Sequence, residues 1–223
     1  MSYVYMLALE KKAEKYDKGI QLSTFKKLEN IQKDIIENYV KSEDLVLEIG
    51  MGTGNIAILC AKKGIKCIGF DNSDKMLSIA RDKLKKMGLL KKIKILKLAI
   101  IEMDSTFEDN MFDKVIASLV FSELYKKEQY FCLKEIFRVL RDDRELILID
   151  EVKPKKIWKK LIFELIRIPL LLITFFKTHL STRSLNEIDE KLQKGNFEII
   201  ERKHYLYDSL IVIRAKKLRD DAK

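Results

Sequence analysis

Residues 45–54 read LVLEIGMGTG. An apolar run over 45–49 enters a turn with glycine at positions 50, 52 and 54, and a helical pattern follows. Glycine suits a tight strand-to-helix turn because it adopts positive φ without strain and lets a ligand approach a backbone that lacks Cβ. The helix start then presents free N–H groups and a partial positive charge to an anionic group. The stretch therefore predicts a nucleotide-type binding turn.

The glycine spacing argues against a dinucleotide fingerprint. That motif reads Gly-x-Gly-x-x-Gly, and here Asn55 stands where the last glycine would be. A second strand pattern, residues 66–70, ends at Asp71, whose carboxylate can accept hydrogen bonds from both ribose hydroxyls. Together, Glu-x-Gly-x-Gly-x-Gly and the later acid resemble class I S-adenosylmethionine-dependent methyltransferases. A dehydrogenase-like nucleotide binder and a fold that has lost its ligand remain alternatives.

Composition favours one continuous domain. The chain has 223 residues, is 47% hydrophobic and contains only 2 Pro and 8 Gly, so it can bury a large core and leaves no room for a long linker. Its three cysteines have no metal-ligand spacing, and their odd number argues against a disulfide framework. We therefore expect a reduced, cytoplasmic protein with small core cysteines and no metal site.

The formal net charge of +10 raises the question of an acidic partner. Lysine pairs such as Lys62/Lys63 and Lys126/Lys127 are spread along the sequence, and no basic stripe with interleaved aromatic residues is present. Solvated helix faces explain these lysines, so the pattern argues against a nucleic-acid partner.

Alternating strand and helix patterns predict a doubly wound α/β sheet, mostly parallel and seven-stranded, with a helical cap insertion. The expected strands are 45–49, 66–70, 93–98, 113–117, 145–149, 197–200 and 210–214, and the main helices are 55–62, 74–87 and 127–140. The last two strands are expected to form a hairpin-like pair at one edge. Residues 1–40 are expected to form an N-terminal helical cap on the single domain 1–223.

One segment does not fit the plain fold. Residues 158–176 are densely apolar and lie inside an expected insertion, 154–185. Glu164 and Arg167 interrupt the run, whereas a membrane-spanning helix needs about 20 mostly apolar residues. We expect a helical cap over the site or a face that binds a protein partner. Contact with a membrane surface is the alternative, because Lys155, Lys156, Lys159 and Lys160 flank the run.

Short motifs along nearly the whole chain resemble a narrower group, the corrinoid-protein-associated methyltransferases of methanogenic archaea. These motifs are YDKGI at 16–20, VFSEL at 120–124, DEVKP at 150–154 and THLSTR at 178–183. The resemblance implies an archaeal, cytoplasmic enzyme of methanogenesis with S-adenosylmethionine as its cofactor.

The resemblance also implies a role for individual residues. Glu48 would hold the aminoacyl end of the cofactor, Asp71 the ribose hydroxyls, and Ser118 would lie beneath the methionine portion. The remaining cofactor-binding positions are Tyr16, Gly50, Gly52, Gly54, Asn72 and Met76. One departure concerns adenine: the family has an acid after the third strand, whereas this chain has Leu98–Ile101 and then Glu102.

Methyl transfer from a sulfonium is an in-line displacement, so the protein must align the reacting atoms and exclude water, without a metal. A thiol or amine acceptor must also lose a proton to a general base. The acceptor is expected beyond the carboxyl ends of strands four and five, where Glu123, Asp150, Glu151 and His179 are candidates. Glu123 or Glu151 is the preferred base.

These features predict a methyltransferase acting on a protein side chain or a small metabolite in methanogen metabolism. A second hypothesis is a non-catalytic binding or assembly module that keeps the fold and uses the apolar segment as its interface. A third, an RNA methyltransferase, is motivated by net charge alone.

Overall fold

The computed structural model of the chain describes residues 27–152, 154, 158, 185 and 187–219. Its α-helices are α3 (Lys27–Asn38), α4 (Asn55–Lys62), α5 (Asp74–Lys86), α6 (Met103–Thr106), α7 (Lys126–Val139) and α9 (Ile188–Lys194). Its strands are β1 (Leu45–Ile49), β2 (Lys66–Asp71), β3 (Ile93–Lys97), β4 (Phe112–Ser118), β5 (Leu140–Glu151), β6 (Phe197–Tyr205) and β7 (Leu210–Lys217). Short 3-10 turns are η1 (Leu90–Lys92), η2 (Ile100–Glu102) and η3 (Phe121–Glu123).

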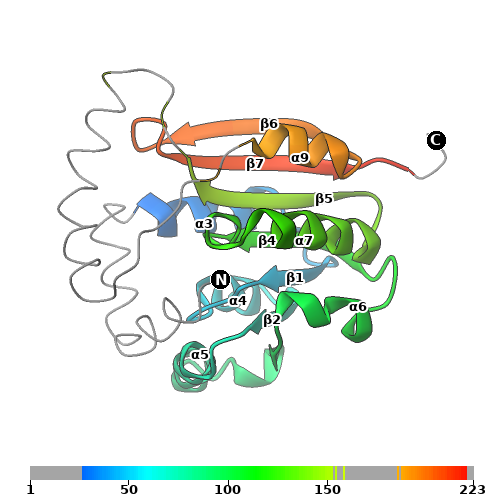
Figure 1. Ribbon diagram of the computed structural model, residues 1–223. Coiled ribbons are helices and arrows are strands. Elements are labelled where there is room, and N and C mark those ends of the chain that lie inside the picture. Colours follow the sequence, from blue (N-terminus) through cyan, green and yellow to red (C-terminus); the bar gives the residue numbers. More distant parts are fainter. Residues whose placement is uncertain (1–26, 153, 155–157, 159–184, 186, 220–223) are drawn as a thin grey trace.

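The strands form a seven-stranded sheet in the order β3-β2-β1-β4-β5-β7-β6 (Figure 1). β1 runs parallel to β2 and β4, whereas β7 runs antiparallel to both β5 and β6. The register places Ile49 beside Phe70 on one side and Ala117 on the other, so β1, β2 and β4 end at the same edge of the sheet. The predicted doubly wound, mostly parallel sheet is therefore confirmed, as is the hairpin-like pair at its edge.

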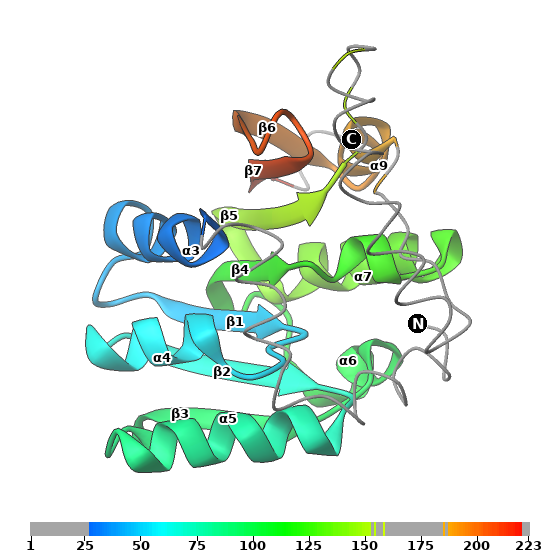
Figure 2. The ribbon, with the colours of Figure 1, turned by 90° about the vertical axis from the view of Figure 1, so that its left-hand side faces the viewer.

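Helices cover both faces of the sheet (Figure 2). Alternate strand residues supply the two cores because successive side chains of a strand point to opposite faces. Val46, Ile116 and Ile147 pack in one apolar cluster with α3, α4 and α5. Leu47, Val115 and Leu148 pack in the other with α7 and α9. All three cysteines, Cys60, Cys67 and Cys132, are buried and unpaired, as expected for small core residues.

The observed strands run longer than the sequence pattern predicts at polar stretches. β5 begins at Leu140 instead of residue 145, and β7 continues to Lys217 instead of ending at 214. Ion pairs join these polar extensions: Asp142 lies 3.0 Å from Lys217, and Asp143 lies 2.8 Å from Lys216. These ion pairs lie just beyond the last β5–β7 backbone pair and hold the two polar ends together.

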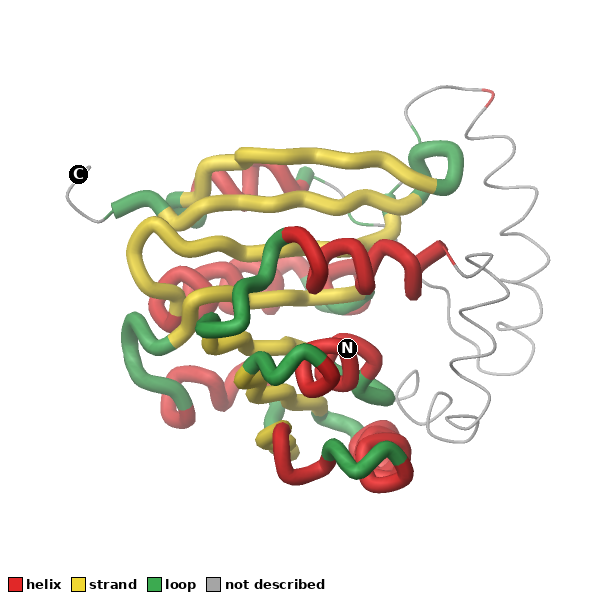
Figure 3. Tube along the Cα trace, turned by 180° about the vertical axis from the view of Figure 1, so that it is seen from behind, coloured by secondary structure: helices red, strands yellow, loops and turns green. Residues whose placement is uncertain are grey.

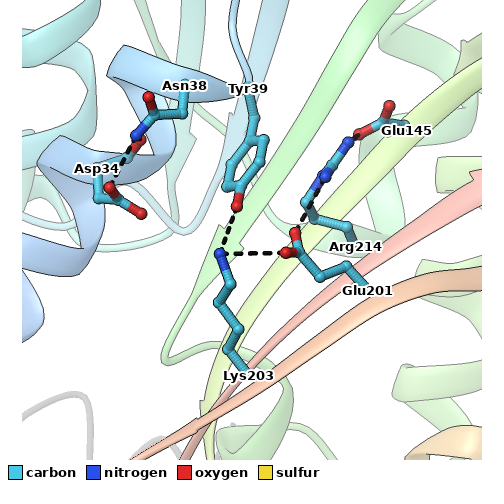
Figure 4. A network of polar contacts seen from close by, with 7 residues as sticks. All are labelled: Asp34, Asn38, Tyr39, Glu145, Glu201, Lys203 and Arg214. Atoms are coloured by element: carbon cyan, nitrogen blue, oxygen red, sulfur yellow. Dashed lines mark hydrogen bonds and ion pairs between the residues drawn. The ribbon is translucent and has the colours of Figure 1, made fainter.

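Seen from behind, α3 lies across one face of the sheet (Figure 3). A polar network attaches the residue after α3 to the far edge of the sheet (Figure 4). The Tyr39 hydroxyl accepts a hydrogen bond from Lys203 Nζ at 2.6 Å, and Lys203 pairs with Glu201 at 3.1 Å. Arg214 bridges Glu201 and Glu145, each at 3.0 Å, and its guanidinium carbon lies 4.0 Å from the centroid of the Tyr39 ring. The network therefore ties the end of α3 to β5, β6 and β7.

Several predictions concern other parts of the chain. The N-terminal cap up to residue 26 and most of the apolar insertion, together with Tyr16 and His179, lie outside the described residues. Within the described residues, none of the helices combines the length and the apolar character needed to cross a bilayer.

Candidate functional site

The glycine turn after β1 is built from left-handed backbone. Gly50, Gly52 and Gly54 have φ of +63°, +51° and +79°, values that residues with a Cβ rarely adopt. The Gly54 N–H donates to the Met51 carbonyl at 2.8 Å, and the Met51 N–H donates to the Phe70 carbonyl at 2.9 Å. These bonds fix the turn between β1 and α4 beside the end of β2.

Neighbouring side chains approach the glycine backbones closely. A Cβ on Gly50 would lie 2.5 Å from Val120 Cγ2, and one on Gly69 would lie 2.7 Å from Met51 Sδ. A Cβ on Gly52 would meet no described atom within 4 Å. Gly50 is therefore required for packing as well as for φ, whereas the described residues leave open space beside Gly52.

Glu48 lies buried beside the turn, with 4% of its surface exposed. Its Oε2 accepts a hydrogen bond from the Ala57 N–H at 2.9 Å, in the first turn of α4. Burial raises the pKa of Glu48 to about 8, and Asp71 adds to the rise, while the Ala57 N–H and Lys83 oppose it. A neighbouring cation would stabilise the ionised form of this carboxyl group, which is unfavourable in the apo protein.

Asp71 ends β2 and turns its carboxylate toward the glycine turn. Oδ2 accepts from the Gly52 N–H and Oδ1 from the Ser73 N–H, both at 2.8 Å. Burial raises the pKa of Asp71, and the two backbone N–H groups and Lys97 oppose the rise. Since each carboxylate oxygen has two lone pairs, Asp71 retains capacity to accept bonds from a pair of hydroxyl donors.

Two lysines reach the same end of the sheet. Lys83 on α5 donates to Asn55 Oδ1 at 2.7 Å and to Thr53 Oγ1 at 3.2 Å, at the start of α4. Lys97, at the end of β3, pairs with Asp74 at 3.0 Å and donates to the carbonyl of Asn72. These contacts hold the segments that follow β1 and β2 next to each other.

The other predicted cofactor positions occupy the same edge. Ser118 ends β4, and its hydroxyl accepts a hydrogen bond from Gln32 Nε2 of α3 at 3.1 Å. Asn72 is exposed directly after Asp71, whereas Met76 is 4% exposed and contributes to the core. The sequence analysis did not identify Gln32, although a glutamine among the apolar positions of α3 is the signal that marks it.

The candidate acceptor-side acids differ in their surroundings. Glu123 in η3 and Glu151 at the end of β5 are half-buried at the edge where β4 and β5 end. Asp150 is fully buried, and its carboxylate accepts from the N–H groups of Ser122 and Glu151 at 3.1 and 2.8 Å. The structure therefore gives Asp150 a role in holding backbone groups, which removes it from the candidate bases.

The region after β3 is where the sequence departs from the family pattern for adenine recognition. The Glu102 carboxylate accepts a hydrogen bond from the Ala99 N–H at 2.7 Å, so it closes its own turn. Leu98 is buried, and Ala99 and Ile100 are half-buried. These residues can bind a flat aromatic base through apolar contact.

These groups fit S-adenosylmethionine. A buried carboxyl with raised pKa, Glu48, suits a ligand that carries ammonium and sulfonium charges, because a cation there stabilises the ionised form. The left-handed backbone at Gly52 and the hydroxyl-accepting carboxylate of Asp71 suit the part that bears the ribose. Within the described residues, His, Cys, Asp and Glu form no group that could hold a metal ion.

Comparisons with known proteins agree with this geometry. Residues 46–143 match the family model described as "Methyltransferase domain". The chain is 27% identical over 128 residues to the carboxy-S-adenosyl-L-methionine synthase of Nautilia profundicola, covering 55% of this chain and 51% of that protein. It is 30% identical over 123 residues to the demethylmenaquinone methyltransferase of Bacteroides fragilis, covering 53% and 47%. The chain thus spans about half the length of these relatives.

The fold also matches a solved structure over nearly its whole length. A putative S-adenosyl-L-methionine-dependent methyltransferase from Methanococcus maripaludis superposes with a TM-score of 0.67 at 20% identity, covering 96% of this chain and 95% of that one. The chain is therefore similar to class I S-adenosylmethionine-dependent methyltransferases in its fold and, over residues 46–143, in its sequence.

Proposed function

We propose that this chain binds S-adenosylmethionine and transfers its methyl group to a protein side chain or a small metabolite. The observation that carries the proposal is the pair of carboxyl groups, Glu48 and Asp71, on either side of one left-handed glycine turn. When bound, S-adenosylmethionine supplies an electrophilic methyl carbon on a positively charged sulfur. Glu48 would face the cationic aminoacyl end, and Asp71 would accept from the ribose hydroxyls.

The protein's own part in the reaction is alignment, exclusion of water and removal of one proton. Val120 lies beside Gly50, and residues 118–124, which include it, would form the wall on which the acceptor is positioned. Glu123 lies in η3 after β4 and Glu151 ends β5, and they are the proposed bases for a thiol or amine acceptor. His179 and Tyr16 remain proposed as a further base and as a lid over the cofactor.

Calorimetric titration with S-adenosylmethionine tests the proposal directly, with NAD as the comparison ligand. We expect saturable binding of S-adenosylmethionine and none of NAD, because the third glycine of the dinucleotide motif is replaced by Asn55. Binding of NAD alone, or no heat with either ligand at millimolar concentration, would refute it.

The substrate is proposed from the narrower resemblance. The four short motifs at 16–20, 120–124, 150–154 and 178–183 support a setting in methanogen metabolism, linked to corrinoid proteins. Mass spectrometry of cell extracts with and without the gene should then reveal a protein or metabolite that lacks one methyl group in the deletion strain. An unchanged methylation profile under methanogenic growth would contradict this assignment.

A non-catalytic binding module is the second candidate, and one observation favours it. The stretch after β3 is apolar at Leu98–Ile101, and the Glu102 carboxylate that follows accepts from the Ala99 N–H. If the fold serves only for assembly, Asp71→Ala should leave the growth of the organism unchanged. Loss of growth with a correctly folded Asp71→Ala protein would favour catalysis.

A further inference from the structure

We infer that Asp150 and Gln129 are positioning residues that lock residues 119–124 in one conformation against the glycine turn. This segment, here called the η3 turn, includes η3 and leads from β4 toward α7. The inference rests on the proposed function, since it assigns these two residues to the wall between cofactor and acceptor. Neither residue would touch the reacting atoms.

The η3 turn lies against the cofactor-binding backbone. β1 and β4 are neighbouring parallel strands, with Ile49 beside Ala117, so the residues that follow them are adjacent. Val120 is 5% exposed, and its Cγ2 occupies the space where a Cβ on Gly50 would be, at 2.5 Å. A displacement of the η3 turn would therefore open or crowd the glycine turn.

Asp150 holds the η3 turn from the side of β5. It has no exposed surface, and its Oδ2 accepts from the Ser122 N–H at 3.1 Å while Oδ1 accepts from the Glu151 N–H at 2.8 Å. Burial raises the pKa of Asp150 to about 6, hydrogen bonds from Ser122 and Glu151 lower it, and the charge of Glu151 raises it. Both oxygens face donors, so the site requires the ionised carboxylate.

Gln129 holds the same turn from the side of α7. It is 7% exposed, and its Nε2 donates to the Phe121 carbonyl at 2.6 Å and to the Leu124 carbonyl at 3.2 Å. These two carbonyls bracket Ser122 and Glu123. The Asp150 carboxylate thus binds one N–H group of the η3 turn, and Gln129 Nε2 binds two of its carbonyl groups. Two separate elements, β5 and α7, therefore hold the turn.

Backbone hydrogen bonds also hold the η3 turn in one conformation. The Leu119 N–H donates to the Ile149 carbonyl at 2.8 Å, and Leu119 has a left-handed φ of +57°. The Glu123 N–H donates to the Val120 carbonyl at 3.0 Å. Residues 120–122 and Leu124 are buried, whereas Glu123 is half-buried. A residue other than glycine keeps a left-handed conformation only where its surroundings hold it. The hydrogen bonds from the η3 turn to Asp150 and Gln129 supply that constraint for Leu119.

A rigid η3 turn would help methyl transfer. In-line displacement tolerates little error in the placement of the acceptor, and small shifts of remote residues lower rates strongly. Because Val120 contacts Gly50 while Glu123 follows three residues later, one rigid turn would set both the cofactor side and the acceptor side.

Asp150→Asn tests the inference with almost no change in volume. An asparagine has one acceptor oxygen and an NH2 group, so it cannot accept from both N–H donors. We expect faster amide hydrogen exchange at Ser122 and Glu123, and about tenfold weaker S-adenosylmethionine binding, which corresponds to one lost hydrogen bond to a charged group. Gln129→Leu should produce the same pattern, whereas the exposed, unconnected Asp104→Asn should produce neither effect.

The wild-type protein provides a measurement that needs no variant. Since protonation removes an acceptor, the protection factor of the Ser122 amide should fall as the pH drops through about 6, with Glu151 the charged neighbour to be considered. Asp150→Asn should abolish this pH dependence. Unchanged protection and affinity in both variants, or a flat wild-type profile, would overturn the inference.

The two proposals fail separately. If wild-type protein does not bind S-adenosylmethionine but the exchange pattern responds as expected, the positioning contacts stand and the cofactor assignment falls. If the wild type binds and the variants bind equally well with unchanged exchange, the positioning role falls and the cofactor assignment stands.

Discussion

The Asp71 carboxylate accepts a hydrogen bond from the Gly52 N–H at 2.8 Å, so the acid that ends β2 orders the turn that follows β1. In the proposed function the same residue would both stabilise the apo site and face the ligand. This double use explains how a turn with three left-handed glycines keeps one conformation.

Asp71→Asn should weaken S-adenosylmethionine binding by tenfold or more. Asparagine cannot accept from Gly52 and Ser73 together, and hydrogen bonds to charged groups contribute about 1.5–3 kcal/mol. Calorimetry measures the affinity, with Asp104→Asn as the control for a lost surface charge. An affinity equal to that of the wild type would show that Asp71 does not contact the ligand.

Gly50→Ala should destabilise the fold more than an alanine at a glycine that has room. At Gly64, φ is +74° and a Cβ would meet no described atom within 4 Å, so Gly64→Ala carries only the left-handed penalty of about 1–2 kcal/mol. Gly50→Ala adds the contact with Val120 at 2.5 Å, and overpacking costs roughly 1–3 kcal/mol more.

Denaturant unfolding measures both glycine variants. Combining Gly50→Ala with Val120→Ala should recover part of the added loss, because the second change removes the atom that collides. Equal losses at positions 50 and 64, or no recovery in the double variant, would contradict the packing explanation.

Glu48 should make the apo protein less stable as the pH rises. Its folded pKa of about 8 lies above the ordinary value of 4.5, so its contribution is greatest below pH 4.5 and declines between pH 4.5 and 8. One proton gives a limiting slope of about 1.4 kcal/mol per pH unit. Urea unfolding at several pH values should show a steeper decline for the wild type than for Glu48→Gln.

The same carboxyl group should release a proton when the cofactor binds. At pH 7 a carboxyl with a pKa of about 8 is mostly protonated, and a cationic ligand beside it favours the charged form. Calorimetry in buffers of different ionisation enthalpy should detect close to one proton released. Glu48→Gln should release none, and a wild-type heat that is independent of buffer would exclude this linkage.

The sequence predicted the parts of this fold whose pattern is local. β1, α4 and the glycine turn have the predicted bounds because an apolar run, three glycines and a helical repeat follow one another without interruption. The early start of β5 could not be predicted, since residues 141–144 read Arg-Asp-Asp-Arg, which is typical of a polar turn. Leu140 pairs with Phe112 of β4, and Arg141 lies 2.9 Å from Asp113, so contacts with β4 begin the strand there.

The orientation of site residues was less predictable than their position. Asp150 was one of four candidate bases because it follows an apolar strand, yet its carboxylate faces the backbone of the η3 turn. Its partner there, Ser122, lies 28 residues earlier in the chain, so no local pattern of the sequence reveals the contact. For the same reason the partner of Ser118, 86 residues earlier in the chain, was not found.

The contact between Gln32 and Ser118 gives a final prediction about how α3 is placed over the site. Gln32 Nε2 donates to Ser118 Oγ at 3.1 Å, and Gln32 is 6% exposed. A double-mutant cycle with Gln32→Ala and Ser118→Ala should give a coupling of about 0.5–1.5 kcal/mol in unfolding free energy. The exposed bond from Asn38 to Asp34, drawn in Figure 4, offers a matched pair for which we expect a smaller coupling. Equal coupling at the two sites would show that the buried bond does not hold α3 against the end of β4.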